Sequence, residues 1–338
     1  MRPFSYARPD SLDGALAELA GNQGAPDASA APVRPVAGGT NLLDLMKADV
    51  MRPTRLVDIT RLALRGITET GDGGLRLGAL STNAETAWDE RVRARYPLLH
   101  KAILAGASAQ LRNMATNGGN ILQRTRCYYF YDTATPCNKR APGSGCGALT
   151  GVNRIHAILG ASEHCIATHP SDMAVALAAL DATVRVAGPG GERAIPFADF
   201  HRLPGDTPHR ETTLRPEEVV TAIDLPADNL ARHSTYLKAR DRASYAFALV
   251  SAAVALELED GVVRGARLAL GGVAHKPWRD RDAEALLVGK APGRAAFAAV
   301  ADAVLRDAKG HGHNTFKIGL ARSVIVRAFE EAAGLEPS

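Results

Sequence analysis

All four cysteines of this 338-residue chain fall in one stretch rich in glycine, proline and arginine. They are Cys127, Cys137, Cys146 and Cys165. Cysteines that served only as core residues would be scattered through the chain, so their gathering in one irregular segment indicates a shared task. Four thiolates that converge from a loop are typical ligands of an iron–sulfur cluster or of zinc. The segment is therefore expected to fold around a bound group.

The spacing alone leaves four interpretations open: two disulfides, a zinc site, an iron–sulfur cluster, or inert thiols. The intervals of nine, eight and eighteen residues contain no C-x-x-C pair, which counts against a zinc ribbon. Disulfides suit small secreted domains, whereas this chain is large and begins without a signal-peptide core.

Nearby charges favour the cluster, because a buried four-thiolate cluster is anionic and requires cations and N–H donors around it. The candidate cations are Arg124, Arg126, Lys139, Arg140 and Arg154. The glycines expected to leave backbone amides accessible are Gly143, Gly145, Gly147 and Gly151. A solvated basic loop remains the alternative interpretation of these charges.

Composition excludes two classes of protein. The net charge of +4 comes without basic and aromatic stripes, so no nucleic-acid partner is expected. No apolar run approaches the ~20 residues that a membrane-spanning helix needs. The missing signal sequence predicts a cytoplasmic chain, with periplasmic export in the folded state, attached to a signal-bearing partner, as the alternative.

Apolar periodicity and turn residues predict a mixed α+β fold. Helices are expected over 10–21, 82–88, 97–105, 171–182, 292–308 and 315–333, and strands over 34–37, 55–59, 75–80 and 217–226. A Gly-Pro-Gly-Gly turn predicts one hairpin after Thr183, and Asp260-Gly261 predicts another within 248–274. The polar run 227–234 is the linker candidate, which divides the chain into domains 1–228 and 229–338.

Two glycine loops are candidates for binding a dinucleotide. AGGTNL (37–42) lies between a strand and a helix, where free backbone N–H groups and the helix N-terminus favour a phosphate. A second segment with similar glycine, threonine and asparagine residues is RNMATNGGNIL (112–122). The two loops could therefore close on the two sides of one diphosphate. Asp172, in the first turn of a helix, suits a ribose hydroxyl, although a helix-capping role needs no ligand.

Three phrases together carry a family resemblance: VAGGTNLL, RNMATNGGNI and PSDMAVALAALDA. In this order they resemble the FAD-binding subunit of the molybdenum hydroxylases, which include xanthine dehydrogenases, carbon monoxide dehydrogenases and aldehyde oxidoreductases. The similarity extends over TTLRPEEVVTAIDLP and YLKARDRASYAFALVSAAVAL. It implies a two-lobed FAD-binding domain of the vanillyl-alcohol-oxidase/PCMH type, then a small C-terminal domain of antiparallel sheet and helices.

The cysteine-rich insertion, about 124–168, looks like that of bacterial three-subunit aldehyde oxidoreductases, whose flavin subunit holds an additional [4Fe–4S] cluster. The flavin subunits of 4-hydroxybenzoyl-CoA reductases and xanthine dehydrogenases are the alternatives. The resemblance implies that Cys127, Cys137, Cys146 and Cys165 ligate the cluster. It implies FAD diphosphate contacts from Ala37, Gly38, Gly39, Thr40, Asn41 and Leu42, with further contacts from Thr116, Gly119 and Asn120. Asp172 would hold the ribose or ribityl portion, and Lys238 would approach the flavin ring.

The implied function is electron transfer. A molybdenum-cofactor large subunit would oxidise an aldehyde to the carboxylic acid, and a small [2Fe–2S] subunit would pass the electrons to FAD and then to an external acceptor. This chain shows neither a molybdenum pocket nor a ferredoxin cysteine pattern, so both partners are expected, in a heterotrimer. Two hypotheses of other classes remain, a self-sufficient flavin oxidase and a non-enzymatic zinc-binding protein; the acceptor and the aldehyde stay open.

Overall fold

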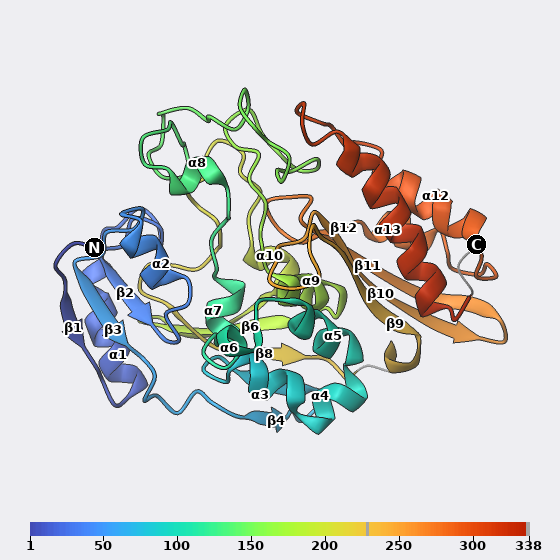
Figure 1. Cartoon of the computed structure of the whole chain (residues 1–338). Helices are drawn as coiled ribbons and strands as arrows, with labels where there is room; N and C mark the ends of the chain where they lie inside the picture. The colour runs from blue at the N-terminus through green and yellow to red at the C-terminus, as the bar shows by residue number, and fades with distance from the viewer. Residues whose placement is uncertain (228–229, 336–338) are drawn as a thin grey trace.

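The first lobe is built on a short parallel sheet near the N-terminus (Figure 1). Its elements are β1 (Ser5–Ala7), α1 (Leu12–Leu19), the 3-10 turn η1 (Ala20–Asn22), β2 (Val33–Val36), α2 (Leu42–Lys47) and β3 (Arg55–Asp58). The computed structural model describes residues 1–227 and 230–335, and in it β3 lies between β1 and β2. Because parallel neighbours need a crossover, α1 and α2 each connect successive strands.

The second lobe is an antiparallel sheet with strand order β4-β5-β8-β6-β7. The strands are β4 (Ile67–Glu69), β5 (Leu75–Gly78), β6 (Thr183–Gly188), β7 (Gly191–Pro196) and β8 (Val219–Leu225). The helices around it are α3 (Asn83–Trp88), α4 (Glu90–Arg95), α5 (Pro97–Ala105), α6 (Ala109–Arg112), α7 (Asn117–Ile121), α9 (Asp172–Ala179) and α10 (Phe197–Phe200). The α3 N-terminus is fixed by a capping box between Thr82 and Glu85.

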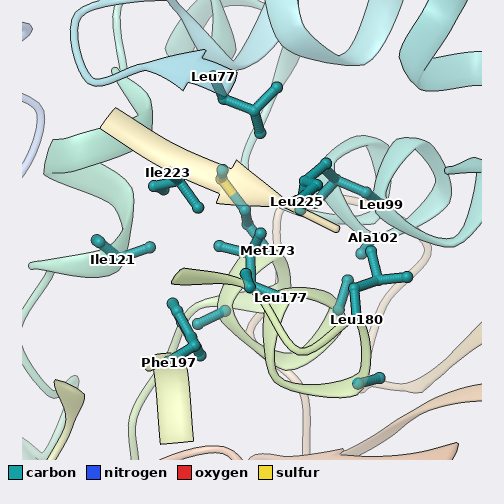
Figure 2. Close-up of a cluster of buried hydrophobic side chains, with 14 of the residues drawn as sticks. Leu77, Leu99, Ala102, Ile121, Met173, Leu177, Leu180, Phe197, Ile223 and Leu225 are labelled. Carbon is teal, nitrogen blue, oxygen red and sulfur yellow. The ribbon is translucent and has the colours of Figure 1, made fainter. Parts of the chain in front are cut away.

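Helix α9 is apolar on every side and lies at the centre of the molecule. Met173 and Leu177 pack against Ile223 and the rest of the second-lobe core, as Figure 2 shows. Its other side packs on two strands of the C-terminal sheet, β10 and β11. A helix that is buried all round carries no polar stripe, so α9 joins the two parts of the chain through one continuous core.

The C-terminal part is an antiparallel sheet, ordered β12-β11-β10-β9, covered by helices. Its elements are the 3-10 turn η2 (Leu230–His233), β9 (Ser234–Ala239), β10 (Val250–Glu259), β11 (Val262–Gly271), β12 (Trp278–Arg279), α11 (Arg281–Ala285), α12 (Arg294–Val304) and α13 (Phe316–Ala332). Along β10, Val254 belongs to the core beneath α12 and α13, whereas Ala253 and Ala255 belong to the core that contains α9. Small residues on that face allow α9 to lie close to the sheet.

The cysteine-rich insertion, here named the thiol segment (124–168), is mostly irregular. Its helix is a single turn, α8 (Tyr128–Tyr131), and it forms the green loops at the top of Figure 1. The start of α13 anchors this segment, because Asn314 Nδ2 donates to the Ala157 carbonyl (2.8 Å) and Lys317 Nζ to the His156 carbonyl (2.8 Å). The carbonyls that an irregular loop leaves without helical partners are thus satisfied by the C-terminal helix.

The predicted α+β architecture is confirmed, and the predicted helices and strands match observed ones within a few residues. Asp260 and Gly261 both have positive φ angles (51° and 73°), as the predicted tight hairpin requires. Of the predicted linker 227–234, residues 228–229 lie outside the described residues, and η2 and β9 begin within the remainder. In the described part of the chain, no helix combines the length and apolar character needed to cross a bilayer.

Candidate functional site

The first glycine loop presents a row of free backbone donors. No described residue accepts a hydrogen bond from the N–H groups of Gly38, Gly39, Thr40 or Asn41. Gly39 has a φ of +70°, a conformation that glycine adopts without strain and that turns the chain into α2. Several N–H groups pointing at one place before a helix make an anion-binding concavity.

The second glycine loop forms the opposite wall of the same cleft. A Cβ on Gly38 would overlap the Met114 carbonyl oxygen, so the two loops touch at this point. The glycine amides of the second loop are already used, however: Gly118 N–H donates to the Ala79 carbonyl, and Gly119 N–H to Thr116 Oγ1. These two glycines therefore contribute a close-packed surface rather than free backbone donors.

Residues of both glycine loops line the cleft, which is partly open to solvent. The lining includes these predicted diphosphate residues: Ala37, Gly38, Gly39, Thr40, Asn41, Leu42, Thr116 and Gly119.

Several buried polar atoms of residues that line the cleft have no hydrogen-bond partner in the described structure. Asn41 Oδ1 accepts from the Arg124 backbone N–H (2.9 Å), while Asn41 Nδ2 and Arg124 Nη2 are both unsatisfied. Arg34 lines the cleft as well, and burial together with the nearby charge of Arg124 lowers the pKa of its guanidinium to about 10. Unpartnered buried donors beside clustered cations favour an anionic ligand, and a diphosphate is one such ligand.

The other predicted FAD residues lie beside the cleft. Lys238 Nζ donates to Asp172 Oδ2 (2.8 Å), and the Tyr236 hydroxyl donates to Asp172 Oδ1 (2.6 Å), so Asp172 and Lys238 form a buried ion pair between α9 and β9. Asn120 Oδ1 accepts from Ser171 Oγ (2.5 Å). None of Asn120, Asp172 and Lys238 is among the described residues that line the cleft, and their predicted roles toward FAD remain predictions.

All four cysteines line one small cavity inside the thiol segment. Cys137 and Cys146 face each other in an isolated antiparallel bridge, and all four are free thiols. Burial raises the pKa of Cys127 to about 12. His156 Nε2 lies 3.0 Å from Cys127 Sγ, a contact that the sequence analysis did not foresee. Four converging thiols form a soft donor set that suits an iron–sulfur group.

The cations and glycines of the thiol segment are used differently from the prediction. Of the predicted cations, Lys139 lines the thiol cavity, whereas the Arg124 side chain lines the cleft and Arg154 pairs with Asp241 on the surface. Arg126 contacts the Tyr131 hydroxyl, and Arg140 donates to the backbone carbonyls of residues 129, 130 and 135.

Three of the four predicted glycines of the thiol segment use their amides within the protein. Gly145 N–H donates to Asn138 Oδ1, Gly147 N–H to the Pro136 carbonyl and Gly151 N–H to the Gly147 carbonyl. Side chains at Gly147 or Gly151 would collide with the Tyr129 ring, so these glycines make room for an aromatic residue. The expectation of accessible amides is wrong at these three positions.

Several residues that line the cleft had no assigned role at the sequence level: Arg34, His169, His201, His209, Arg210 and Glu211. Burial lowers the pKa of His201 to about 4, with the Lys276 charge adding to the effect. The only sequence feature that could have indicated these residues is the run PHRET at 208–212, which places two basic residues beside an acidic one. Such a run is too common to identify a site.

Comparison with known proteins defines the class. Residues 2–228 match the family model described as the FAD binding domain in molybdopterin dehydrogenase, and residues 234–332 match the CO dehydrogenase flavoprotein C-terminal domain. Together with the cleft, these matches identify a flavin-binding subunit of an oxidoreductase. The chain belongs to the family of FAD-binding subunits of molybdenum hydroxylases.

The alignments with known proteins cover most of this chain and most of each relative. The aldehyde oxidoreductase FAD-binding subunit PaoB of Escherichia coli (strain K12) is 54% identical over 298 residues, covering 88% of this chain and 90% of the relative. The glyceraldehyde dehydrogenase medium chain of Sulfolobus acidocaldarius is 30% identical, covering 85% and 82%. The structure of carbon monoxide dehydrogenase from Hydrogenophaga pseudoflava aligns with a TM-score of 0.76 at 28% identity, covering 98% of each chain.

Proposed function

We propose that this chain is the electron-transfer subunit of an aldehyde-oxidising molybdenum hydroxylase and that it carries both FAD and a [4Fe–4S] cluster. The observation that carries the proposal is the 54% identity to an aldehyde oxidoreductase FAD-binding subunit. The cleft and the thiol cavity agree with it, since each offers the donor chemistry that one of the two groups needs.

In the cleft, the free N–H groups of the first glycine loop would bind the diphosphate. Asn41 Nδ2 and Arg124 Nη2, both buried without a partner, would complete its coordination. When bound, FAD supplies an acceptor that takes electrons singly or in pairs, which suits a junction between one-electron centres and a final acceptor.

In the thiol cavity, Cys127, Cys137, Cys146 and Cys165 would ligate the cluster. Among the described residues, no group of three or more His, Cys, Asp or Glu side chains is arranged to hold a single metal ion. What supports the cluster is that four soft thiol donors line one cavity.

The substrate would be oxidised on a partner. An aldehyde and water would give a carboxylic acid, two protons and an electron pair on a molybdenum-cofactor large subunit. The electrons would pass through the [2Fe–2S] centres of a small subunit to this chain and on to an external acceptor. We propose the 4-hydroxybenzoyl-CoA reductase and xanthine dehydrogenase types as alternatives, distinguished by the substrate that the assembled complex oxidises.

Purification of the chain with co-expressed partner subunits tests the proposal. We expect one FAD per chain and about four irons beyond those of the partners' [2Fe–2S] clusters, measured by the visible spectrum, by released flavin and by elemental analysis. Protein without flavin contradicts the cleft assignment. Zinc in place of the additional iron contradicts the cluster, and aldehyde turnover by the isolated chain would instead indicate a self-sufficient oxidase.

A further inference from the structure

A largely buried chain of charged side chains connects the nucleotide cleft to the thiol cavity. We propose that Arg124, Glu211 and Lys139, here named the ion-pair relay, make FAD affinity depend on whether the cluster is present. The inference rests on the proposed function, since it requires that both groups bind. It assigns Arg124 as a phosphate-binding residue and Glu211 as a residue that positions it.

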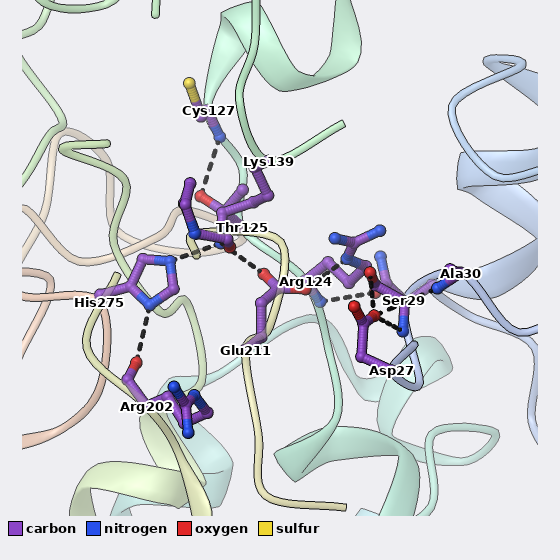
Figure 3. Close-up of polar contacts among 12 residues, drawn as sticks. Asp27, Ser29, Ala30, Arg124, Thr125, Cys127, Lys139, Arg202, Glu211 and His275 are labelled. Carbon is purple, nitrogen blue, oxygen red and sulfur yellow. Dashed lines mark hydrogen bonds and ion pairs between the residues drawn. The ribbon is translucent and has the colours of Figure 1, made fainter. Parts of the chain in front are cut away.

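The contacts are shown in Figure 3. The two carboxylate oxygens of Glu211 are divided between the sites, because Oε1 accepts from Lys139 Nζ (3.0 Å) and Oε2 accepts from Arg124 Nε. Although burial would raise the pKa of Glu211, the charges of Arg124 and Lys139 hold it well below its usual range. Glu211 is therefore a carboxylate that holds one cation from each site.

The Arg124 end of the relay faces the cleft. Its Nη2 is buried without a hydrogen-bond partner, and its backbone N–H is held by Asn41 of the first glycine loop. With Nε used by Glu211, the remaining edge of the planar guanidinium is available for a phosphate oxygen. The orientation of that edge depends on Glu211.

The Lys139 end faces the thiols. Lys139 lines the thiol cavity with its side chain 1% exposed, and its Nζ also donates to the Pro208 carbonyl (2.7 Å). His275 Nδ1 donates to the Arg202 carbonyl (2.9 Å), which leaves Nε2 to accept from Lys139. This neutral acceptor and Glu211 fix the ammonium beside the site proposed for an anionic cluster.

A second contact ties Arg124 to the same cavity. The Arg124 guanidinium lies over the ring of Phe130, 4.6 Å from its centre, and Phe130 lines the thiol cavity. Ligation would order the thiol segment and fix both Phe130 and Lys139. Arg124 would then be held on two sides, by an aromatic face and by Glu211, in the orientation that binds phosphate.

By linkage, if the cluster strengthens FAD binding, FAD strengthens cluster retention by the same factor. The test is a double-mutant cycle in the co-purified complex, in which Cys146→Ser removes the cluster and Glu211→Gln removes the charge of the relay. The FAD dissociation constant is measured by flavin fluorescence after removal of the native flavin, and iron content is measured in every sample. We expect Cys146→Ser to raise this constant at least about fivefold in the wild-type background and to leave it nearly unchanged in the Glu211→Gln background.

The matched control is Glu284→Gln. Glu284 is also buried and holds Arg279 through both oxygens, but it contacts neither site. It should lower stability while keeping the wild-type effect of Cys146→Ser. Should Glu211→Gln fail to fold, Arg124→Lys serves instead: it keeps the charge, loses the planar fork, and should weaken FAD binding by about tenfold with the cluster present.

The outcomes separate the relay from the proposed function. Wild-type protein without the additional iron or without flavin overturns both. If both groups bind and Cys146→Ser leaves the FAD dissociation constant unchanged, the relay alone is overturned. The relay is also overturned if Glu211→Gln keeps the full effect of Cys146→Ser.

Discussion

Gly38 is the residue at which the two glycine loops touch, and its missing side chain allows them to form one cleft. In Gly38→Ala, the new Cβ would overlap the backbone carbonyl of Met114, which no side-chain rotation relieves. Separating the loops should cost about 1–3 kcal/mol and weaken FAD binding by about tenfold. The ratio of flavin absorbance to protein absorbance measures the loss.

Gly319→Ala is the control for Gly38→Ala. Gly319 lies inside α13, where an added Cβ meets no atom within 4 Å. A helix-interior glycine replaced by alanine should stabilise the protein by about 1 kcal/mol with flavin content unchanged. Normal flavin content in Gly38→Ala would show that the loops can move apart at no cost to the site.

Single residues were predictable where the chemistry lies in a short run of sequence. The first glycine loop and the four thiols can each be recognised from a local stretch of sequence. In the structure, the loop lines the cleft and the thiols line the thiol cavity. Glu211 carries no such signal, because its importance comes from neighbours at positions 124 and 139 that only the fold brings near. Sequence also suggested a direct ribose contact for Asp172, whereas the structure shows its carboxylate held by Tyr236 and Lys238.

At the scale of elements, α9 packs closely against the C-terminal sheet. Gly271 of β11 faces Val175 of α9, and a Cβ there would lie 2.4 Å from Ser251 Oγ of β10 and 2.5 Å from Val175 Cγ2. Gly271→Ala should therefore lower the free energy of unfolding by about 1–3 kcal/mol, measured by urea denaturation. The double variant Gly271→Ala/Val175→Ala should recover part of the loss. Unchanged stability in the single variant would mean that α9 can shift away from the sheet.

Long helices and strands were predictable because their apolar residues recur with the period of the face that packs against the core. Short ones, such as β4, α6 and α8, were not predicted, because three or four residues are too few to show a period. The backbone conformation of the thiol segment could not be predicted from the sequence either. Its carbonyl groups accept hydrogen bonds from distant residues such as Asn314 and Lys317, not from a repeating local pattern.

At the scale of the whole molecule, buried neutral histidines set the response to acid. Burial lowers the pKa of His201 to about 4 and, with the charge of Lys139, that of His275 to about 3. In the unfolded chain both titrate near 6.5, so between that pH and their folded values only the unfolded state binds the protons. Stability is therefore lost as pH falls below about 6.5, by about 1.4 kcal/mol per pH unit for each histidine.

Urea unfolding at pH 7, 6 and 5 measures this slope. His201→Gln keeps a donor for the Ile121 carbonyl, which His201 Nε2 contacts at 2.7 Å, and should flatten the slope. The same change at the exposed His313 should leave the slope as it is. Equal stability at pH 7 and pH 5 in the wild type would contradict the assignment of neutral buried histidines.

The anchoring of the thiol segment by α13 has a consequence for biosynthesis. Translation proceeds from the N-terminus, and domains fold as they emerge, yet the carbonyls of His156 and Ala157 find their partners in Lys317 and Asn314, 161 and 157 residues further along the chain. The cavity among the cysteines thus reaches its final form only after the start of α13 has been made. Insertion of the proposed cluster would therefore follow translation of α13, and products truncated before α13 would not present a finished site.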